Sequence, residues 1–132
     1  MSETILPDGW PQPSGYANGI IAEGRIIAVA GQVGWNSRTA RFETDDFVEQ
    51  TRQALRNVRD VLTAGGARVE HVVRLTWYVA SREEYTARLA DVGAAYRDVF
   101  GAQYPAMTLV IVAALLEPRA KVEIEATAVV PG

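Results

Sequence analysis

The chain has 132 residues, a formal net charge of −3 and a sequence isoelectric point near 5.1. This length suits one domain spanning residues 1–132, and the acidic balance argues against nucleic-acid binding. The absence of cysteine excludes disulfides, thiolate metal sites and a cysteine nucleophile. We expect no signal peptide and no membrane segment, because the N-terminus lacks an apolar core and the longest apolar run, 109–116, is too short to span a bilayer. The expected location is therefore the cytoplasm.

The first predicted elements are short. Residues 1–15 are rich in proline and glycine, and we interpret them as an irregular lead-in. Residues 17–22 and 25–31 predict two strands joined at Glu23–Gly24 as a hairpin. Residues 32–43 then form a loop.

A first helix follows this loop. Thr44 is its predicted N-cap, and Gly65–Gly66 ends it. Apolar and small residues recur at helical spacing and predict one core-facing stripe, formed by Phe47, Thr51, Ala54, Leu55, Val58, Val61 and Leu62.

The second half of the chain alternates strands with another helix. Residues 72–79, VVRLTWYV, are β-branched and aromatic and predict a strand. Ser81 and Glu84 form an S-x-x-E capping box that begins the second helix, and Gly101 ends it. A further strand is predicted over 106–115.

The last predicted strand, 121–130, alternates between two faces. The order of elements predicts an α+β domain with a mixed six-stranded sheet and two helices on one face. The other face stays rich in apolar residues although no helix remains to cover it. We therefore expect other subunits to cover this face, with binding sites at the subunit boundaries.

Few residues have the pattern of a known catalytic or cofactor site. His71 is the single histidine, and no G-x-S-x-G motif accompanies it, so a catalytic histidine is disfavoured. No set of residues has metal-ligand spacing, and no glycine-rich phosphate loop is present. We therefore expect no metal and no cofactor.

Glu123 and Glu125 share one side of the last strand, which otherwise has the pattern of a buried strand. A buried carboxylate is costly unless it is hydrogen-bonded or protonated, so either one could serve as a general acid or base. The alternative is that both are partly exposed or ion-paired at a subunit interface. Trp77 alternates with core residues and is expected to pack, whereas Trp35 follows Gly34 in a loop and is free to line a pocket.

Several segments, in this order and spacing, resemble the RidA/YjgF family of small trimeric imine and enamine deaminases. They are Tyr16, AVAGQ (28–32), the helix 50–67, HVVRLTWYV (71–79), YPAMT (104–108) and KVEIEATAV (121–129). The resemblance implies a homotrimer with a chorismate-mutase-like fold and a small-molecule ligand in three inter-subunit clefts. It also implies cofactor-free hydrolysis of 2-imino or 2-enamino acids to keto acids and ammonia.

Some of the family's site positions are kept. Tyr16 and Gly31 stand where the family has its pocket tyrosine and glycine, and Glu123 stands at the carboxylate that positions the hydrolytic water. Thr108 keeps part of the frame of the anion-binding segment.

Other positions differ from the family pattern. Met107 replaces the arginine that holds the substrate carboxylate, Gly93 replaces an asparagine on the second helix, and Leu109 replaces a frequent cysteine. Hydrogen bonds to charged groups contribute roughly 1.5–3 kcal/mol, and methionine offers no donor. We therefore expect poor activity on simple 2-imino acids. Arg74 could supply a substitute cation from its strand, but its alternation places it opposite Trp77.

Three functions are consistent with this pattern. The first is a deaminase or hydrolase for a larger, more apolar, aminomuconate-like substrate, with Glu123 as catalytic group and Met107, Trp35 and Trp77 as an apolar wall. The second is a non-catalytic trimer that binds a small metabolite. The third is a structural trimer with a relic pocket.

Overall fold

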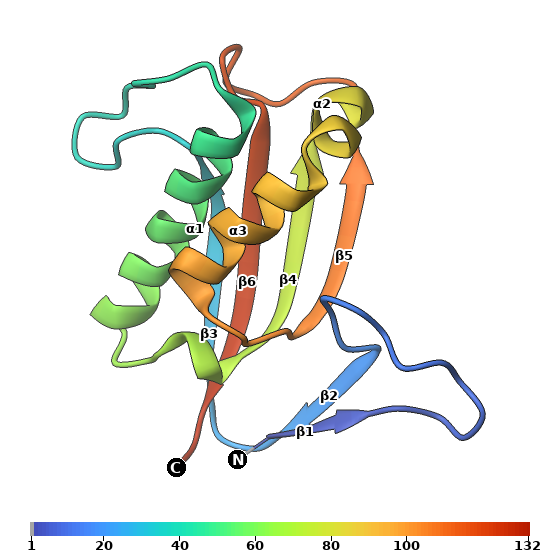
Figure 1. Ribbon diagram of the computed structural model, residues 1–132. Helices are drawn as coiled ribbons and strands as arrows, with labels where there is room; N and C mark the ends of the chain where they lie inside the picture. Colours follow the sequence, from blue (N-terminus) through green and yellow to red (C-terminus); the bar gives the residue numbers. More distant parts are fainter. Residues whose placement is uncertain (1) are drawn as a thin grey trace.

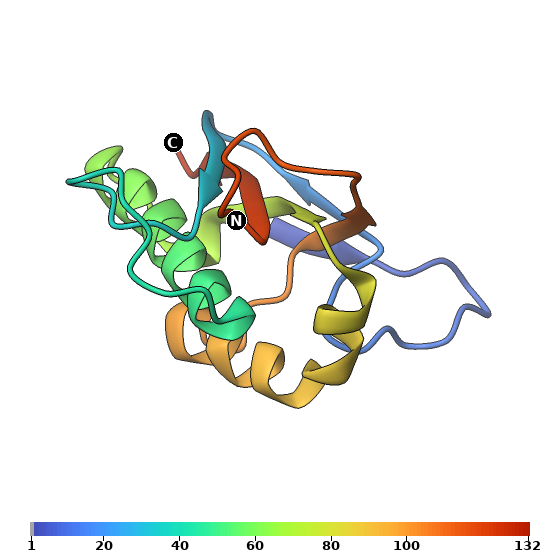
Figure 2. The ribbon, with the colours of Figure 1, turned by 90° about the horizontal axis from the view of Figure 1, so that it is seen from above.

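A computed structural model describes residues 2–132 and has the α+β architecture that the sequence predicts (Figure 1). The elements are β1 (Ser2–Ile5), β2 (Gly19–Ala22), β3 (Arg25–Val33), α1 (Phe47–Ala64), the 3-10 turn η1 (Val69–His71), β4 (Val72–Val79), α2 (Arg82–Ala87), α3 (Leu89–Phe100), β5 (Ala106–Ile111) and β6 (Val122–Val130). Figure 2 shows the two long helices, α1 and α3, on one side of the sheet.

The strands of residues 2–132 fall into two sheets rather than the single six-stranded sheet that we predicted. The main sheet has the order β3-β6-β4-β5, and β1 and β2 form a separate antiparallel pair. Pairing β4 parallel to β5 requires a crossover, which α2 and α3 provide.

The predicted hairpin at Glu23–Gly24 is wrong, because β2 pairs with β1 while β3 pairs with β6. Gly24 has φ +148°, and a Cβ built there would lie 2.0 Å from the carbonyl oxygen of Val130. The chain therefore needs glycine at the point where it passes close to the end of β6 on its way from β2 to β3. The lead-in is also not wholly irregular, since Ser2–Ile5 forms β1 through backbone pairing that its side-chain pattern does not reveal.

Helix α1 begins later than predicted. The Asp46 carboxylate, not Thr44, is the N-cap, and it accepts the backbone N–H of Glu49 at 3.0 Å. Asp46 satisfies a free donor of the first turn and also places negative charge at the positive end of the helix dipole. The predicted stripe is buried except at Val61, which is exposed.

The predicted second helix is divided into α2 and α3. Ser81 caps α2 by accepting the N–H of Glu84 at 3.2 Å, as predicted, whereas the Glu84 carboxylate pairs with Lys121 at 2.9 Å. The helix breaks at Arg88, where φ is −131° and ψ is 34°. Its guanidinium donates to Asp46 at 2.8 Å and so ties the break to the start of α1.

Two buried amides of α1 attach loops to the core. Gln50 donates to the carbonyl of Arg119 at 3.0 Å and accepts the N–H of Lys121 at 2.9 Å. Asn57 donates to the carbonyl of Val33 at 3.0 Å. These bonds hold the segment that leads into β6 and the end of β3 against α1. The apolar pattern of the sequence does not specify these attachments.

The two faces of the sheet differ as the alternation of the last strand predicts. The residues of β6 that face the helices are buried, namely Val122, Ile124, Ala126, Ala128 and Val130. The residues between them are half-buried on the opposite face, called the open face below. Within residues 2–132, no helix combines the length and apolar character needed to cross a bilayer.

Candidate functional site

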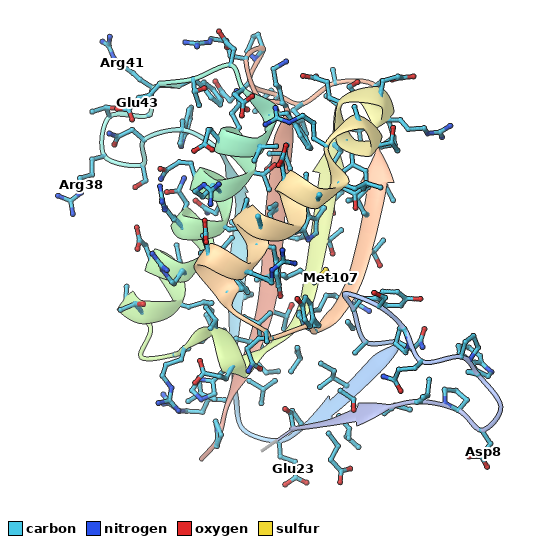
Figure 3. The ribbon with its side chains drawn as sticks, in the orientation of Figure 1. Asp8, Glu23, Arg38, Arg41, Glu43 and Met107 are labelled. Atoms are coloured by element: carbon cyan, nitrogen blue, oxygen red, sulfur yellow. The ribbon has the colours of Figure 1, made fainter. Side chains whose placement is uncertain are left out.

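A cavity of about 550 Å³ lies between the sheet and helices α2 and α3. Its lining includes Met107 and Trp77 on the sheet and Gly93 on α3. Met107 is the second residue of β5, opposite Leu75 of β4 (Figure 3). The remaining lining residues are Ser14, Gly15, Tyr16, Tyr85, Leu89, Val92, Tyr96, Arg97, Tyr104 and Leu109.

The N-terminal segment closes one side of this cavity. The backbone N–H of Ala17 donates to the carbonyl of Pro105 at 3.0 Å, and Ala17 forms an isolated bridge with Ala106. This bond places Tyr16 beside the first residues of β5, with 43% of its surface still exposed. The proline that precedes β5 therefore contributes a carbonyl that positions a cavity residue.

Aromatic rings form the deep wall of the cavity. Tyr96 stacks on Tyr104 with ring centroids 5.4 Å apart and lies 6.4 Å from Trp77. The Tyr96 hydroxyl donates to the carbonyl of Gln103. Burial, followed by the neighbouring Tyr104, raises the pKa of Tyr96, so this hydroxyl stays neutral and does not act as a base.

Trp77 is the one side chain among the described residues with a buried polar atom that lacks a hydrogen-bond partner. Its surface is 4% exposed, and the atom is the indole Nε1 donor. A buried donor left unpaired costs about 1–3 kcal/mol.

A second group of predicted site residues lies on the open face. A Cβ built on Gly31 would lie 2.1 Å from Oε2 of Glu123, so the absence of a side chain at Gly31 leaves room for this carboxylate. Gly31 lies in the irregular register of β3, between Val29 and Gln32, where the extra residue bends the strand. Gly31 and Glu123 are therefore brought together, as the sequence predicts for one site.

Tyr78 joins Glu123 on this face, because the two residues are opposite each other in the β4–β6 ladder. Loss of solvent, then the charge of Glu125 and that of Glu123, raise the pKa of Tyr78 above its ordinary value. The open face thus gathers two carboxylates and a neutral phenol.

The predicted site residues are divided between the two faces of the sheet. Tyr16, Trp77, Gly93 and Met107 line the cavity, whereas Gly31 and Glu123 lie on the open face. This separation has a simple cause, since alternate residues of β6 point to opposite faces and the buried set faces the helices.

The other candidates lie elsewhere. Trp35 packs against Phe42 in the loop before α1, with ring centroids 5.6 Å apart, and is not among the lining residues. Thr108 and Arg74 are exposed and also do not line the cavity. His71 accepts the backbone N–H of Arg68 at 3.0 Å, which is a structural contact.

Arg97 is the main lining residue that the sequence reasoning missed. Tyr85, Val92 and Tyr96 pack against the core, whereas Leu89 and Arg97 are exposed. The spacing from Gly93 could have identified Arg97 as a cavity residue. A helical side chain leans back over the residue four positions earlier, which for Arg97 is Gly93. Within residues 2–132, no group of three or more His, Cys, Asp or Glu side chains is placed to hold a metal ion.

The fold and the cavity define a small α+β protein whose apolar pocket lies between a mixed sheet and its crossover helices. Residues 11–130 match the protein family described as Endoribonuclease L-PSP. A 2-iminobutanoate/2-iminopropanoate deaminase of Escherichia coli is 35% identical over 133 residues, which cover 98% of this chain and 98% of that protein. The chain belongs to this family, which is the RidA/YjgF family that its motifs resemble.

Solved structures agree with this assignment. A protein of unknown function from the Rid family of Yersinia pestis aligns with a TM-score of 0.81 at 36% identity, covering 98% of each chain. The YjgF gene product of Escherichia coli aligns with a TM-score of 0.68 at 33% identity, covering 96% of this chain and 98% of its own.

Proposed function

We propose that this protein hydrolyses 2-imino or 2-enamino acids that carry a large apolar or aromatic group. The observation that carries the proposal is the cavity of about 550 Å³ that Tyr16, Trp77, Gly93 and Met107 line together. Small-molecule sites span roughly 300–1,000 Å³ and are mostly apolar. The activity named for the Escherichia coli relative supports the reaction class, and the aromatic walls support an apolar substrate.

The proposed reaction consumes one water and releases one ammonia. Water adds to the imine carbon while the Glu123 carboxylate accepts the water proton. The Glu123 carboxylic acid returns this proton to the nitrogen, which gives a neutral carbinolamine. Glu123 then moves the hydroxyl proton of the carbinolamine to the nitrogen, so that ammonia leaves and a keto acid remains. Glu123 returns to its charged form, and no redox step or cofactor enters the balance.

In this proposal Glu123 acts on a substrate held in the cavity of a neighbouring subunit. Within one chain, Glu123 points to the open face, away from the cavity. The open face has no helix over it, and Ile26 on β3 is 72% exposed. An exposed apolar side chain on a half-buried sheet face supports association, and the homotrimer implied by the family resemblance is the proposed assembly.

Binding of a small metabolite without catalysis is the second candidate function. The observation that favours it is Met107, which removes from β5 the cation expected to orient a substrate carboxylate. Cleavage of RNA, which the family description names, has little support here. The net charge is −3, and the single histidine, His71, serves as a local hydrogen-bond acceptor.

The test compares two imino acids generated in place from L-phenylalanine and L-alanine by an amino-acid oxidase. The protein is expected to accelerate release of the keto acid from the aromatic imine at least about 10-fold more than from the small one, since apolar pocket contacts discriminate on this scale. If neither imine is accelerated while phenylpyruvate raises the melting temperature, the protein binds without catalysis.

A further inference from the structure

The cavity contains a positive charge that comes from a helix rather than from the sheet. Among the described residues that line it, Arg97 of α3 is the only charged one. No hydrogen bond or ion pair within residues 2–132 engages its guanidinium. The acidic residues of α3 are paired with other arginines, Asp91 with Arg88 at 3.0 Å and Asp98 with Arg52. Arg97 therefore faces the cavity with its donors available.

Gly93 makes room for this guanidinium. A Cβ built on Gly93 would lie 3.2 Å from Nη1 of Arg97, which is tighter than ordinary van der Waals contact. The two residues are four apart, so the Arg97 side chain leans back across the bare backbone of Gly93 toward the cavity. A side chain at position 93 would compete with the guanidinium for this space. Glycine inside a helix costs about 0.5–1 kcal/mol relative to alanine, which is consistent with a functional reason for it.

We propose that Arg97 is the residue that binds the ligand's carboxylate and that it replaces the arginine missing at Met107. This inference rests on the proposed function for the identity of the ligand, an aromatic or large apolar carboxylate. Arginine stays charged at any working pH and binds a carboxylate through two parallel donors. The anion therefore binds at α3, and the apolar body of the ligand points toward Met107 and Trp77 on the sheet.

This arrangement explains two departures from the family pattern together. Met107 supplies an apolar floor where a second arginine would repel Arg97, and Gly93 opens the path for Arg97. The site would select a carboxylate at one end and an aromatic group at the other.

The test measures binding by calorimetry with phenylpyruvate and with its methyl ester, which lacks the charge. Arg97→Met is expected to weaken phenylpyruvate binding about 10-fold or more and to leave ester binding within about twofold. Arg97→Lys keeps the positive charge but loses the two parallel donors of the guanidinium. Its affinity for phenylpyruvate is expected to lie between those of wild type and Arg97→Met. The matched control is Arg56→Met, an exposed arginine on α1 that does not line the cavity, with no expected change.

Two further variants test the geometry. Gly93→Asn retains Arg97 but fills the space beneath its guanidinium, and is expected to weaken phenylpyruvate binding by a similar factor. The double variant Arg97→Met/Met107→Arg returns the cation to β5 and is expected to restore binding of pyruvate better than that of phenylpyruvate. Melting curves for each variant establish that it is folded.

The outcomes separate this inference from the proposed function. Equal loss of acid and ester binding in Arg97→Met, unchanged binding, or no wild-type preference for the acid would overturn the role of Arg97. Binding that favours the acid and depends on Arg97, without hydrolysis of the aromatic imine, supports the role of Arg97 as the carboxylate-binding residue. The same result contradicts the proposed deaminase activity. Hydrolysis that is unchanged in Arg97→Met upholds the deaminase and rejects Arg97.

Discussion

The two faces of the main sheet differ in how far a single chain completes them. The helix-facing side is covered by α1, α2 and α3 and holds a partly open cavity with aromatic walls and one arginine (Figure 2). The open face carries Glu123, Glu125 and Tyr78 on a half-buried surface with no helix above it. One face thus has the features of a binding pocket, and the other carries carboxylates that do not line this cavity.

This difference indicates how the proposed chemistry depends on assembly. Each chain carries both halves of the site, but strand alternation directs them to opposite faces. A second copy is therefore the simplest partner that could place a carboxylate next to the cavity.

Removing the acid–base group on the open face should have the largest effect. Glu123→Gln is expected to slow imine hydrolysis about 100-fold or more, because positioned proton transfer contributes roughly 10²–10⁴-fold. Phenylpyruvate binding should persist, since the cavity residues are unchanged. The control is Glu125→Gln on the same strand and face, for which little change in rate is expected. Equal rates for wild type and Glu123→Gln would remove Glu123 from the mechanism.

Moving the same carboxylate without deleting it should have a smaller effect. In Gly31→Ala the new Cβ occupies space 2.1 Å from Oε2 of Glu123, so the flexible carboxylate must shift. A displacement of about 1 Å can lower a rate by up to about 100-fold, and we expect a loss of about 10- to 100-fold in steady-state assays. In the Glu123→Gln background the same substitution should add nothing. Additive losses in the double variant would mean that Gly31 acts independently of Glu123.

Charging the open face should weaken association. Ile26 is 72% exposed in one chain, so Ile26→Asp should scarcely disturb the fold of a subunit. In an assembly, the new carboxylate would be buried without a partner, at a cost of about 1–3 kcal/mol or roughly 10-fold or more in association. Sedimentation velocity over a concentration series measures this shift. Val61→Asp, on the exposed side of α1, is the control, and an equal shift in both variants would contradict the proposed interface.

The smallest expected effect is a pH-dependent loss of stability when Asp46, at the start of α1 in the helix layer, loses its charge. The hydrogen bond from Arg88, followed by the backbone N–H of Glu49, lowers the pKa of Asp46 below its ordinary 3.8. The folded pKa is depressed, so this contribution is complete above about pH 4 and is lost as the pH falls through the folded value. Asp46→Asn keeps the cap but loses the charge.

Because Asp46 and Arg88 are both partly exposed, we expect Asp46→Asn to lower the free energy of unfolding by about 0.2–1 kcal/mol at pH 7. The difference from wild type should be smaller at pH 3 than at pH 7, because the carboxyl group of the unfolded chain is then mostly protonated. Urea unfolding at both pH values provides the measurement, and a difference that grows in acid would mean that the Asp46–Arg88 pair is not its source.

Local patterns predicted much of the fold. The stripe of α1, the S-x-x-E start at Ser81 and the alternation of β6 are all found in the structure, with Val61 as an exception. These features depend on neighbours three, four or two positions away, so the sequence carries them directly. The hairpin at Glu23–Gly24 failed because two adjacent strands each paired with a segment distant in the chain.

The structure brings some of the predicted site residues together and separates others. Tyr16, Trp77, Gly93 and Met107 do line one cavity, and Gly31 does adjoin Glu123. Trp35 instead packs on Phe42, since the bonds of Asn57 hold its loop close to α1. A loop side chain has no periodic neighbours from which its direction could be inferred.

The sequence by itself determined the order of the elements, the two faces of β6 and membership of the RidA/YjgF family, because these follow from residue type and short-range spacing. The resemblance to the family also places Met107 where that family is expected to have an arginine. The tertiary structure alone decided that Glu123 lies on the face opposite the cavity and that Arg97 reaches the cavity across Gly93. Both depend on which helix packs over which strands, and that choice is made by long-range packing of the whole chain.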